Sequence, residues 1–557
     1  FCPETPNLRI SRAKLLVRIS LCLIFDLQFM TLISFSQQPI PEWESNYNGL
    51  LTLGAHSVSI KADGFGNIYV LNKVFTDTSS GDFCIMKYAS NGSFVWERIY
   101  NSPGNLNDVS VAFDVTQTGD VYLTGSSGLN FTTHITTIKY NSNGLFQWAK
   151  IFSGGNTDGP GDIRIDNNGD VIVIGGSFAN GVGSALTIKY SSVGDSLWVE
   201  KFNPFSSNFN RKLFIDVDNN VYTAGYAGND MLILKYDQKG ILLWSRLYNS
   251  PQNYSDGALG ITLDINGNIY VVGTSSVPSE FSDNHLLRLD NNGQINWVRT
   301  FTGIIPGNGK CKFPCGVVTS SNGSQIYYST YCYNNSGYEI VTLSYSSSGD
   351  TQWVRRYWGN VDNLQNIPSD IIIDRFDNIY IAGTVSYPDS GEDFVLIKFL
   401  QNGLQQWLTK YNGPLVNSSN ILSRAILDTS NNIFVTGSSS IQNNPLLYEA
   451  TTIKYSQPVG IINNQNASSK EYNLFQNFPN PFNPSTKIIF SIPKRAYVQI
   501  QIYDILGRIK ELIVQEFMNP AEYELTIDGS QYSSGVYFYQ LVADGKIMDT
   551  KKFMIIK

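Results

Sequence analysis

Tryptophan recurs along this chain at a nearly constant interval, and that interval constrains the fold more than any other feature. Eight tryptophans, most of them just after a glycine-containing turn, are separated by 46 to 56 residues. They are Trp43, Trp96, Trp148, Trp198, Trp244, Trp297, Trp353 and Trp407. A period of this length indicates a repeat architecture.

The stretch from Asp264 to Trp297 shows what is repeated. Its short apolar runs are rich in β-branched and aromatic residues, and Gly-Asn or Asn-Gly dipeptides separate them. This pattern predicts consecutive antiparallel hairpins. A strand like Asn268–Gly273 and a following strand that ends in Lys-Tyr recur in most repeats. Four strands in about fifty residues is the size of one propeller blade.

The two ends of the repeat region predict how the ring closes. No tryptophan strand follows Tyr455, whereas 42–47 is a tryptophan strand with no strands before it. The N-terminal strand therefore completes the last blade, and residues 37–455 are predicted to form an eight-bladed propeller. The sixth repeat, with Gln325–Tyr328 as its second strand, departs most from the pattern.

The charge and the histidine and cysteine content of the chain limit which partners and which kinds of site are expected. The net charge is −7, and no Lys/Arg cluster is present, which argues against nucleic acid as a partner. Only three histidines occur, without metal-ligand spacing, so no zinc site, His-based triad or other cofactor site is predicted. Cys311, Cys315 and Cys332 share one repeat, where they either form a local disulfide or remain reduced and buried.

The N-terminal 36 residues have the pattern of a secretory signal. Four basic residues precede the apolar run 21–33, and small residues lead to a predicted cleavage site before Gln37. No second long apolar stretch follows, so no membrane span is predicted.

A second domain is predicted at the C-terminus. Residues 456–471 are rich in Asn and Ser and are expected to form a linker. Residues 472–557 alternate apolar and polar residues after a proline-rich entry, which predicts a small Ig-like β-sandwich.

Residues 472–557 resemble the type A C-terminal sorting domain of the type IX secretion system of Bacteroidetes. The matching positions are Asn477–Pro481 with Pro479, Asn480 and Pro481, then Asp504 to Arg508 with Gly507, and finally Gly535, Tyr537, Lys551 and Lys552. The resemblance implies export by a cleavable signal and then by the outer-membrane secretion machinery, followed by release or surface attachment. The repeats resemble the bacterial SBBP-type β-propeller repeat, which implies an architecture and no particular activity.

Three motifs have alternative interpretations. Turns such as Asp166–Asp170 share spacing with calcium loops, but no bidentate acid follows, and Asp and Asn favour turns by their own hydrogen bonds. The tryptophans could stack sugars, yet one per blade favours packing between blades. Asp162 and Asp370 each lie four residues before a turn aspartate, where they act either as an acid–base pair or, as we favour, as solvated or capping residues.

The sequence thus predicts an all-β protein that is secreted or displayed on the cell surface. Its favoured role is a binding or structural module for an extracellular glycan or protein. The alternative is an extracellular glycoside hydrolase or polysaccharide lyase with Asp162 and Asp370 as its acids.

Overall fold

The structure is a computed structural model in which the described residues start at Gln38, so the predicted signal peptide (1–36) lies outside them. The described residues are 38–49, 54–75, 81–104, 106–129, 132–251, 253–276, 282–303, 311–334, 337–359, 365–387, 391–415, 418–428, 431–443, 446–456, 462–464, 471–483, 485–518, 520–529 and 532–556. They form β-strands and no α-helix, which confirms the all-β class. Among these residues, no helix is long and apolar enough to cross a membrane.

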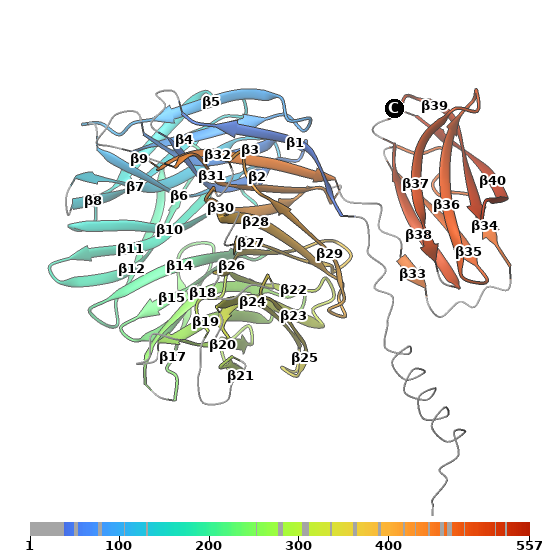
Figure 1. The fold of residues 1–557 in the computed structure, drawn as a ribbon. Helices are drawn as coiled ribbons and strands as arrows, with labels where there is room; N and C mark the ends of the chain where they lie inside the picture. Colours follow the sequence, from blue (N-terminus) through green and yellow to red (C-terminus); the bar gives the residue numbers. More distant parts are fainter. Residues whose placement is uncertain are drawn as a thin grey trace, which may run out of the picture.

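Eight groups of four strands follow one another along the chain, and we call them sheets 1 to 8 (Figure 1). A single parallel pair, Thr157 with Thr133, joins sheets 2 and 3 into one eight-stranded sheet. Sheet 1 is β2 (Ala55–Ala62), β3 (Ile68–Phe75), β4 (Gly81–Tyr88) and β5 (Phe94–Tyr100). Sheet 2 is β6 (Asn107–Val115), β7 (Val121–Leu129), β8 (Thr132–Tyr140) and β9 (Phe146–Phe152). Sheet 3 is β10 (Thr157–Ile165), β11 (Val171–Ala179), β12 (Val182–Tyr190) and β13 (Ser196–Phe202). Sheet 4 is β14 (Asn208–Ile215), β15 (Val221–Ala227), β16 (Asp230–Tyr236) and β17 (Leu242–Tyr248).

The second half of the repeat region has the same order. Sheet 5 is β18 (Ser255–Leu263), β19 (Ile269–Ser276), β20 (Ser282–Leu289) and β21 (Ile295–Phe301). Sheet 6 is β22 (Gly316–Thr319), β23 (Gln325–Tyr333), β24 (Tyr338–Ser346) and β25 (Thr351–Tyr357). Sheet 7 is β26 (Asn366–Ile373), β27 (Ile379–Tyr387), β28 (Gly391–Phe399) and β29 (Gln405–Tyr411). Sheet 8 is β30 (Asn420–Leu427), β31 (Ile433–Asn443), β32 (Leu446–Ser456) and β1 (Ile40–Tyr47).

Sheet 8 is assembled from both ends of the repeat region, as the tryptophan count predicts. β1 pairs antiparallel with β32, from Ile40 opposite Ser456 to Tyr47 opposite Ala450. Trp43 of β1 lies opposite Lys454 of β32, and β32 in turn pairs with β31, which carries Ile433. The Trp43 ring packs near the rings of Phe434 and Tyr88. The N-terminal strand therefore occupies the position that a hairpin strand occupies in every other sheet.

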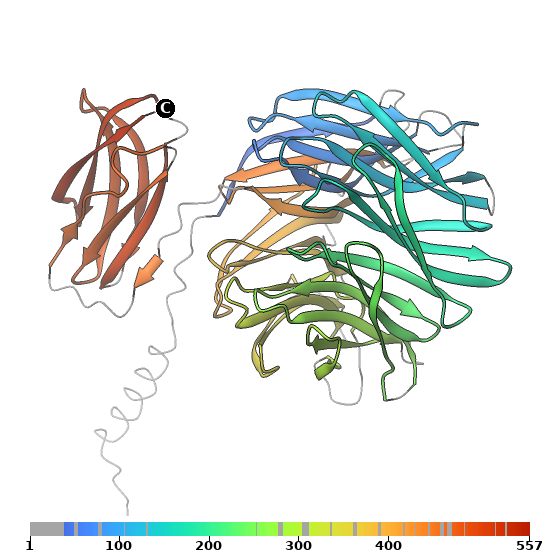
Figure 2. The same ribbon diagram turned by 180° about the vertical axis from the view of Figure 1, so that it is seen from behind.

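Hydrophobic cores lie between consecutive sheets rather than within one sheet. The core between sheets 4 and 5 combines Tyr222 and Ile233 with Ile269 and Leu287, and equivalent clusters join every consecutive pair. One further cluster joins sheet 8 to sheet 1. Each first strand also contacts the first strand of the next sheet (Figures 1 and 2). The first strand of sheet 8, β30, contacts β2 of sheet 1, so the order of these contacts is cyclic.

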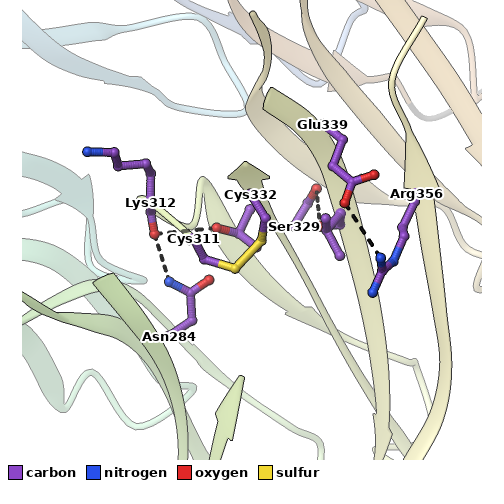
Figure 3. The surroundings of a disulfide bond; sticks show 9 residues. Asn284, Cys311, Lys312, Ser329, Cys332, Glu339 and Arg356 are labelled. Carbon is purple, nitrogen blue, oxygen red and sulfur yellow. Dashed lines mark hydrogen bonds and ion pairs between the residues drawn. A yellow bond between two sulfur atoms is a disulfide. The ribbon is translucent and has the colours of Figure 1, made fainter. Parts of the chain in front are cut away.

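Sheet 6, the sheet with the least regular sequence, is reinforced covalently (Figure 3). Its first strand has only four residues, and Cys311, just before it, forms a disulfide with Cys332 on β23. The backbone of Cys311 also forms an isolated β-bridge with Ser282 of β20, so the same residue links sheets 5 and 6. Cys315 and Cys84 are free.

The C-terminal residues form two further four-stranded sheets around one shared core. One contains β33 (Ile462–Asn464), β34 (Asn473–Leu474), β35 (Ser485–Ile492) and β38 (Ala521–Asp528). The other contains β36 (Ala496–Asp504), β37 (Ile509–Met518), β39 (Gly535–Ala543) and β40 (Lys546–Ile555). β33 lies inside the stretch predicted as a linker and pairs with β38.

Candidate functional site

The first strands carry charged residues at an equivalent register in four of the eight sheets. Seven first strands carry a β-bulge, and a bulge re-aims the side chain next to it. The residue after the bulge is small in sheets 1, 2 and 5 and charged in sheets 3, 4, 7 and 8. These residues are Ser59, Ala112, Gly260, Asp162, Lys212, Asp370 and Arg424.

Asp162 is buried and held within its own strand. Its Oδ1 accepts a hydrogen bond from Ile163 N at 2.9 Å and lies 3.6 Å from Arg164 Nη1. The side chain of Arg164 is 37% exposed, so solvent reaches this part of the molecule. In sheet 2, Asp114 Oδ2 accepts from Ile165 N at 3.0 Å and Oδ1 lies 3.6 Å from Lys61 Nζ.

Asp370 is held by sheets 7 and 8. Its Oδ1 accepts from Ile371 N at 3.0 Å and its Oδ2 accepts from Ala425 N at 3.2 Å. Burial raises the pKa of Asp370, and the positive charges of Arg424 and Lys212 oppose that rise. Arg424 Nη1 donates to Ser369 O at 2.9 Å and to Ser423 O at 3.0 Å.

Lys212 interacts electrostatically with both of the predicted acids, Asp162 and Asp370. Burial lowers the pKa of Lys212, while Asp162 and Asp370 raise it and Arg424 and Arg164 lower it further. Arg164, in turn, has its pKa raised first by Asp162 and then, against burial, by Asp114 and Asp370. Charged groups from sheets 2, 3, 4, 7 and 8 thus influence one another.

We call these residues the inner charge cluster; its members are Lys61, Asp114, Asp162, Arg164, Lys212, Asp370 and Arg424. Each of its carboxylates has a cationic neighbour and at least one backbone donor, and no hydrogen bond between Asp162 and Asp370 appears among the described residues. Asp162 and Asp370 are therefore engaged by cations and backbone donors.

The turn residues considered for calcium are engaged within the fold. Asp166 Oδ1 accepts from Asn168 N at 2.9 Å and Asp170 N at 3.0 Å, and its Oδ2 lies 2.6 Å from Lys189 Nζ. The described residues contain no group of three or more His, Cys, Asp or Glu side chains that could hold a metal ion.

A buried Ser–His–Asp array lies in sheet 5, and sequence spacing did not indicate it. Ser275 Oγ donates to Asp256 and lies 2.7 Å from His285 Nε2. Because the one serine proton goes to the carboxylate, His285 Nε2 donates to Ser275, and Nδ1 accepts from Thr300 Oγ1 at 3.0 Å. A catalytic triad needs the carboxylate on the histidine, and these side chains are 1–2% exposed, so the array is structural.

The tryptophans join neighbouring sheets, as predicted. Six indole N–H groups donate to a turn carbonyl of the next sheet at 2.9 to 3.4 Å. Two surface hollows, of about 430 and 320 Å³, lie over the outer strands of sheets 1 to 3, and neither is lined by Asp162 or Asp370.

In the C-terminal sheets, predicted motif positions from the beginning and the end of the segment contact one another. Asn480 Nδ2 donates to Lys552 O at 3.2 Å, and Met554 N donates to Asn480 Oδ1 at 2.9 Å. Pro479 and Pro481 both follow cis peptide bonds, and Pro479 O accepts from Thr486 Oγ1 at 2.7 Å.

The remaining motif positions shape turns and strand ends. Gly507 has φ of +74° in the turn where Arg508 Nε donates to Asp504 Oδ2 at 2.8 Å. Tyr537, which follows Gly535 and Val536 at the start of β39, donates its OH to Ser533 O at 3.0 Å. The exposed Lys552 follows Lys551, which lies 3.0 Å from Asp549.

Residues 476–557 match the family described as a secretion system C-terminal sorting domain. A protein with such a sorting domain is exported through the type IX secretion system to the cell surface or the medium, so this chain is a secreted or surface protein.

Upstream of the sorting domain, residues 243–278 match a family described as a beta-propeller repeat, and they span β17, β18 and β19. Together the two matches confirm the resemblances read from the motifs. No curated protein matches the sequence.

Solved structures similar to the chain show low identity. A quinohemoprotein alcohol dehydrogenase, ADHIIG from Pseudomonas putida HK5, is 10% identical with a TM-score of 0.46, covering 76% of this chain and 78% of that one. Sqt1 from Chaetomium thermophilum is 9% identical with a TM-score of 0.46, covering 75% and 100%. A protein from Lactobacillus plantarum is 12% identical with a TM-score of 0.41, covering 62% and 95%. Likenesses at these TM-scores do not bear on the function.

Proposed function

We propose that the protein is an extracellular binding module built on a closed eight-bladed β-propeller, which spans 37–455 and is delivered by an Ig-like sorting domain at 472–557. The cyclic order of first-strand contacts and of the cores between sheets supports a closed ring of eight. The shared core of the two C-terminal sheets supports the sandwich.

The observation that carries the binding role is the inner charge cluster. It places partly exposed charged side chains, such as Arg164 and Lys61, on strands that are fixed by their neighbours on both sides. A rigid frame that presents charge to solvent is suited to hold a charged ligand, because little conformational entropy is lost on binding.

The test is binding of the mature full-length chain to arrays of extracellular glycans and proteins. We expect specific signals that weaken as salt is raised, since charges at the site are screened. A chain that binds nothing on either array would contradict the binding role and favour a purely structural one.

The alternative function is a glycan-cleaving enzyme, and the raised pKa of Asp370 is the observation that favours it. The test is polysaccharide turnover by the mature chain and by Asp162→Asn and Asp370→Asn. Turnover that both substitutions abolish would establish the enzyme. Turnover that neither substitution affects, or no turnover, would remove the two aspartates as catalytic residues.

A further inference from the structure

A buried lysine of sheet 4 contacts a side-chain amide of sheet 5. Lys235, on β16, is 6% exposed, and its Nζ donates to Asn291 Oδ1 at 2.5 Å. Asn291 lies in the turn between β20 and β21, where its backbone O accepts from Trp244 Nε1 at 3.0 Å. One donor of sheet 4 therefore holds the backbone of this turn, and another holds its side chain.

In two other sheets the equivalent lysine reaches a different group. Lys87 Nζ donates to Ser142 O at 3.2 Å, and Lys139 Nζ donates to Ser192 O at 3.0 Å, so both lysines meet a backbone carbonyl of the next sheet. Ser142 and Ser192 occupy the turn position that Asn291 occupies in sheet 5. Contact between neighbouring sheets therefore does not require the carboxamide that Asn291 supplies.

The buried phenol of Tyr222 contacts the same amide oxygen. Its OH lies 3.2 Å from Asn291 Oδ1 and 3.1 Å from Asp216 Oδ2, so its one proton can be donated to either oxygen. Tyr222 is 1% exposed, and burial, followed by the charge of Asp216, raises its pKa, so the phenol stays protonated. Asn291 belongs to an exposed turn, but its amide oxygen is bonded by two buried side chains.

These contacts bring together the parts of an amide-forming reaction. A lysine is nucleophilic when its amine is neutral, and burial lowers the pKa of Lys235, although Asp216 and Asp218 oppose this effect. The amide carbon of Asn291 is one bond away from the oxygen that Nζ contacts. A donor at that oxygen stabilises the negative charge that develops during attack, and holding both groups in one fold favours their reaction.

We propose that Lys235 and Asn291 form an intramolecular isopeptide bond that joins sheets 4 and 5 covalently. Tyr222 is the donor to Oδ1 during the attack. This modification is independent of the proposed binding role, because it involves none of the inner charge cluster.

The reaction balances without an oxidant or a reductant. Lys235 Nζ loses one proton to solvent at the exposed turn, and its lone pair forms a bond to Cγ of Asn291 while the π pair of the carbonyl moves to Oδ1. That pair then returns, the Cγ–Nδ2 bond breaks, and a second proton passes from Nζ to Nδ2. Nδ2 leaves as ammonia, and a secondary amide remains.

Peptide mapping of the mature full-length chain tests for this bond. Trypsin does not cut after an acylated lysine, so the digest should contain a branched peptide in which 213–239 is joined to 289–299. Its mass should equal the sum of the two peptides minus one ammonia, and fragmentation should place the bond at Lys235 and Asn291. A digest in which 213–235 and 289–299 occur only as separate linear peptides would overturn the proposal.

Two controls locate the bond. Asn291→Ala, at the exposed turn, should abolish the branched peptide and restore cleavage after Lys235. A branched peptide that persists in this variant would contradict the assignment to Asn291. Lys139 is the matched control within the same digest, because it meets a backbone carbonyl, and trypsin should cut after it completely.

Tyr222→Phe tests the role of the phenol. In a time course after expression, the branched peptide should form about tenfold more slowly or less, because the donor to Oδ1 is lost. An unchanged rate would overturn the role assigned to Tyr222. Circular dichroism shows whether the variant is folded, and if it is not, the wild-type digest and Asn291→Ala decide whether the bond exists.

Discussion

Asp264 shows why the repeat keeps an aspartate, an asparagine and a tyrosine at fixed spacing. Its Oδ1 accepts from Asn266 N and Asn268 N at 2.9 Å, while Oδ2 accepts from Asn268 Nδ2 at 2.7 Å and Tyr270 OH at 3.2 Å. The carboxylate thus fixes the turn and satisfies the buried phenol of the next strand. Equivalent bonds form around Asp63 and Asp374.

His285 is expected to make stability depend on pH. Burial lowers its pKa below 6.5, against the opposing charge of Asp256. Below pH 6.5 the unfolded chain therefore binds a proton that the folded chain does not, and stability falls as pH decreases toward the folded-state pKa. Tyr248 OH, 3.3 Å from Nδ1, offers no compensating charge.

The measurement is the unfolding midpoint of wild type and His285→Gln between pH 7.5 and 5, a range of about one unit or more on either side of the ordinary histidine pKa. The wild type should lose more stability than the variant over this range. Equal slopes would show that His285 does not contribute. His56, whose pKa burial also lowers, remains in both proteins.

Gly240 is expected to tolerate alanine poorly. It has φ of +85°, and an added Cβ would lie 2.7 Å from Trp198. Gly267 is the matched control, with φ of +77° and nothing within 4 Å. Gly267→Ala should cost about 1–2 kcal/mol from backbone strain, and Gly240→Ala about 1–3 kcal/mol more from overpacking. Chemical denaturation measures both, and equal losses would exclude the contact with Trp198.

At the scale of elements, the last strand of each sheet joins it to the next. Trp353 Nε1 donates to Gln401 O at 2.9 Å, and Arg355 Nε donates to Gly403 O at 2.6 Å, so one strand contributes two donors to the neighbouring turn. Trp43 holds the equivalent position on β1, yet its Nε1 has no acceptor within the described part of the chain. β1 is therefore attached by its ladder, by packing, by the ion pair of Glu42 with Lys454 and by the hydrogen bond that Tyr411 OH donates to Glu44.

Trp43→Ala should loosen β1. The indole lies against Gly92 of sheet 1 and 5.9 Å from Phe434 of sheet 8, so its removal takes contacts from both. We expect a loss of about 2–3 kcal/mol and faster hydrogen exchange in 450–456, opposite β1. Trp358→Ala is the control, because Trp358 is 49% exposed. Unchanged exchange in the first variant would show that β1 is held without the indole.

Sequence periodicity was sufficient for the strands but not for the disulfide. Hairpin turns and tryptophan spacing depend on local geometry, and the eight sheets follow them. Cys311 and Cys315 lie four residues apart, and only the position of the short β22 relative to β23 decides that Cys311 meets Cys332. That position depends on packing against sheet 5, which no local pattern contains.

The site was predictable in part for the same reason. Asp162 and Asp370 were found by their offset of four residues from a turn aspartate. Lys212 and Arg424 lie at the same offset before Asp216 and Asp428, so aligning the repeats on their turns identifies these two residues as well. The buried Ser275–His285 contact had no such signal, because it joins facing strands of one sheet.

At the scale of the molecule, the sorting domain has a core of its own. Every residue of that core lies between 472 and 555. A chain without residues 472–557 should therefore keep the thermal transition of the eight sheets while a second transition disappears, which calorimetry measures. In the native cell this chain should fail to reach the surface, as fractionation would show. A shift of the remaining transition would contradict independent cores.

The pairing of Ile40 with Ser456 has a consequence for biosynthesis. A polypeptide whose translation stops early lacks β32, and its first strand finds no neighbour. The same product also lacks the segment that directs export. Completion of sheet 8 and export therefore both require the chain to be synthesised beyond β32, so a product that stops earlier should lack both.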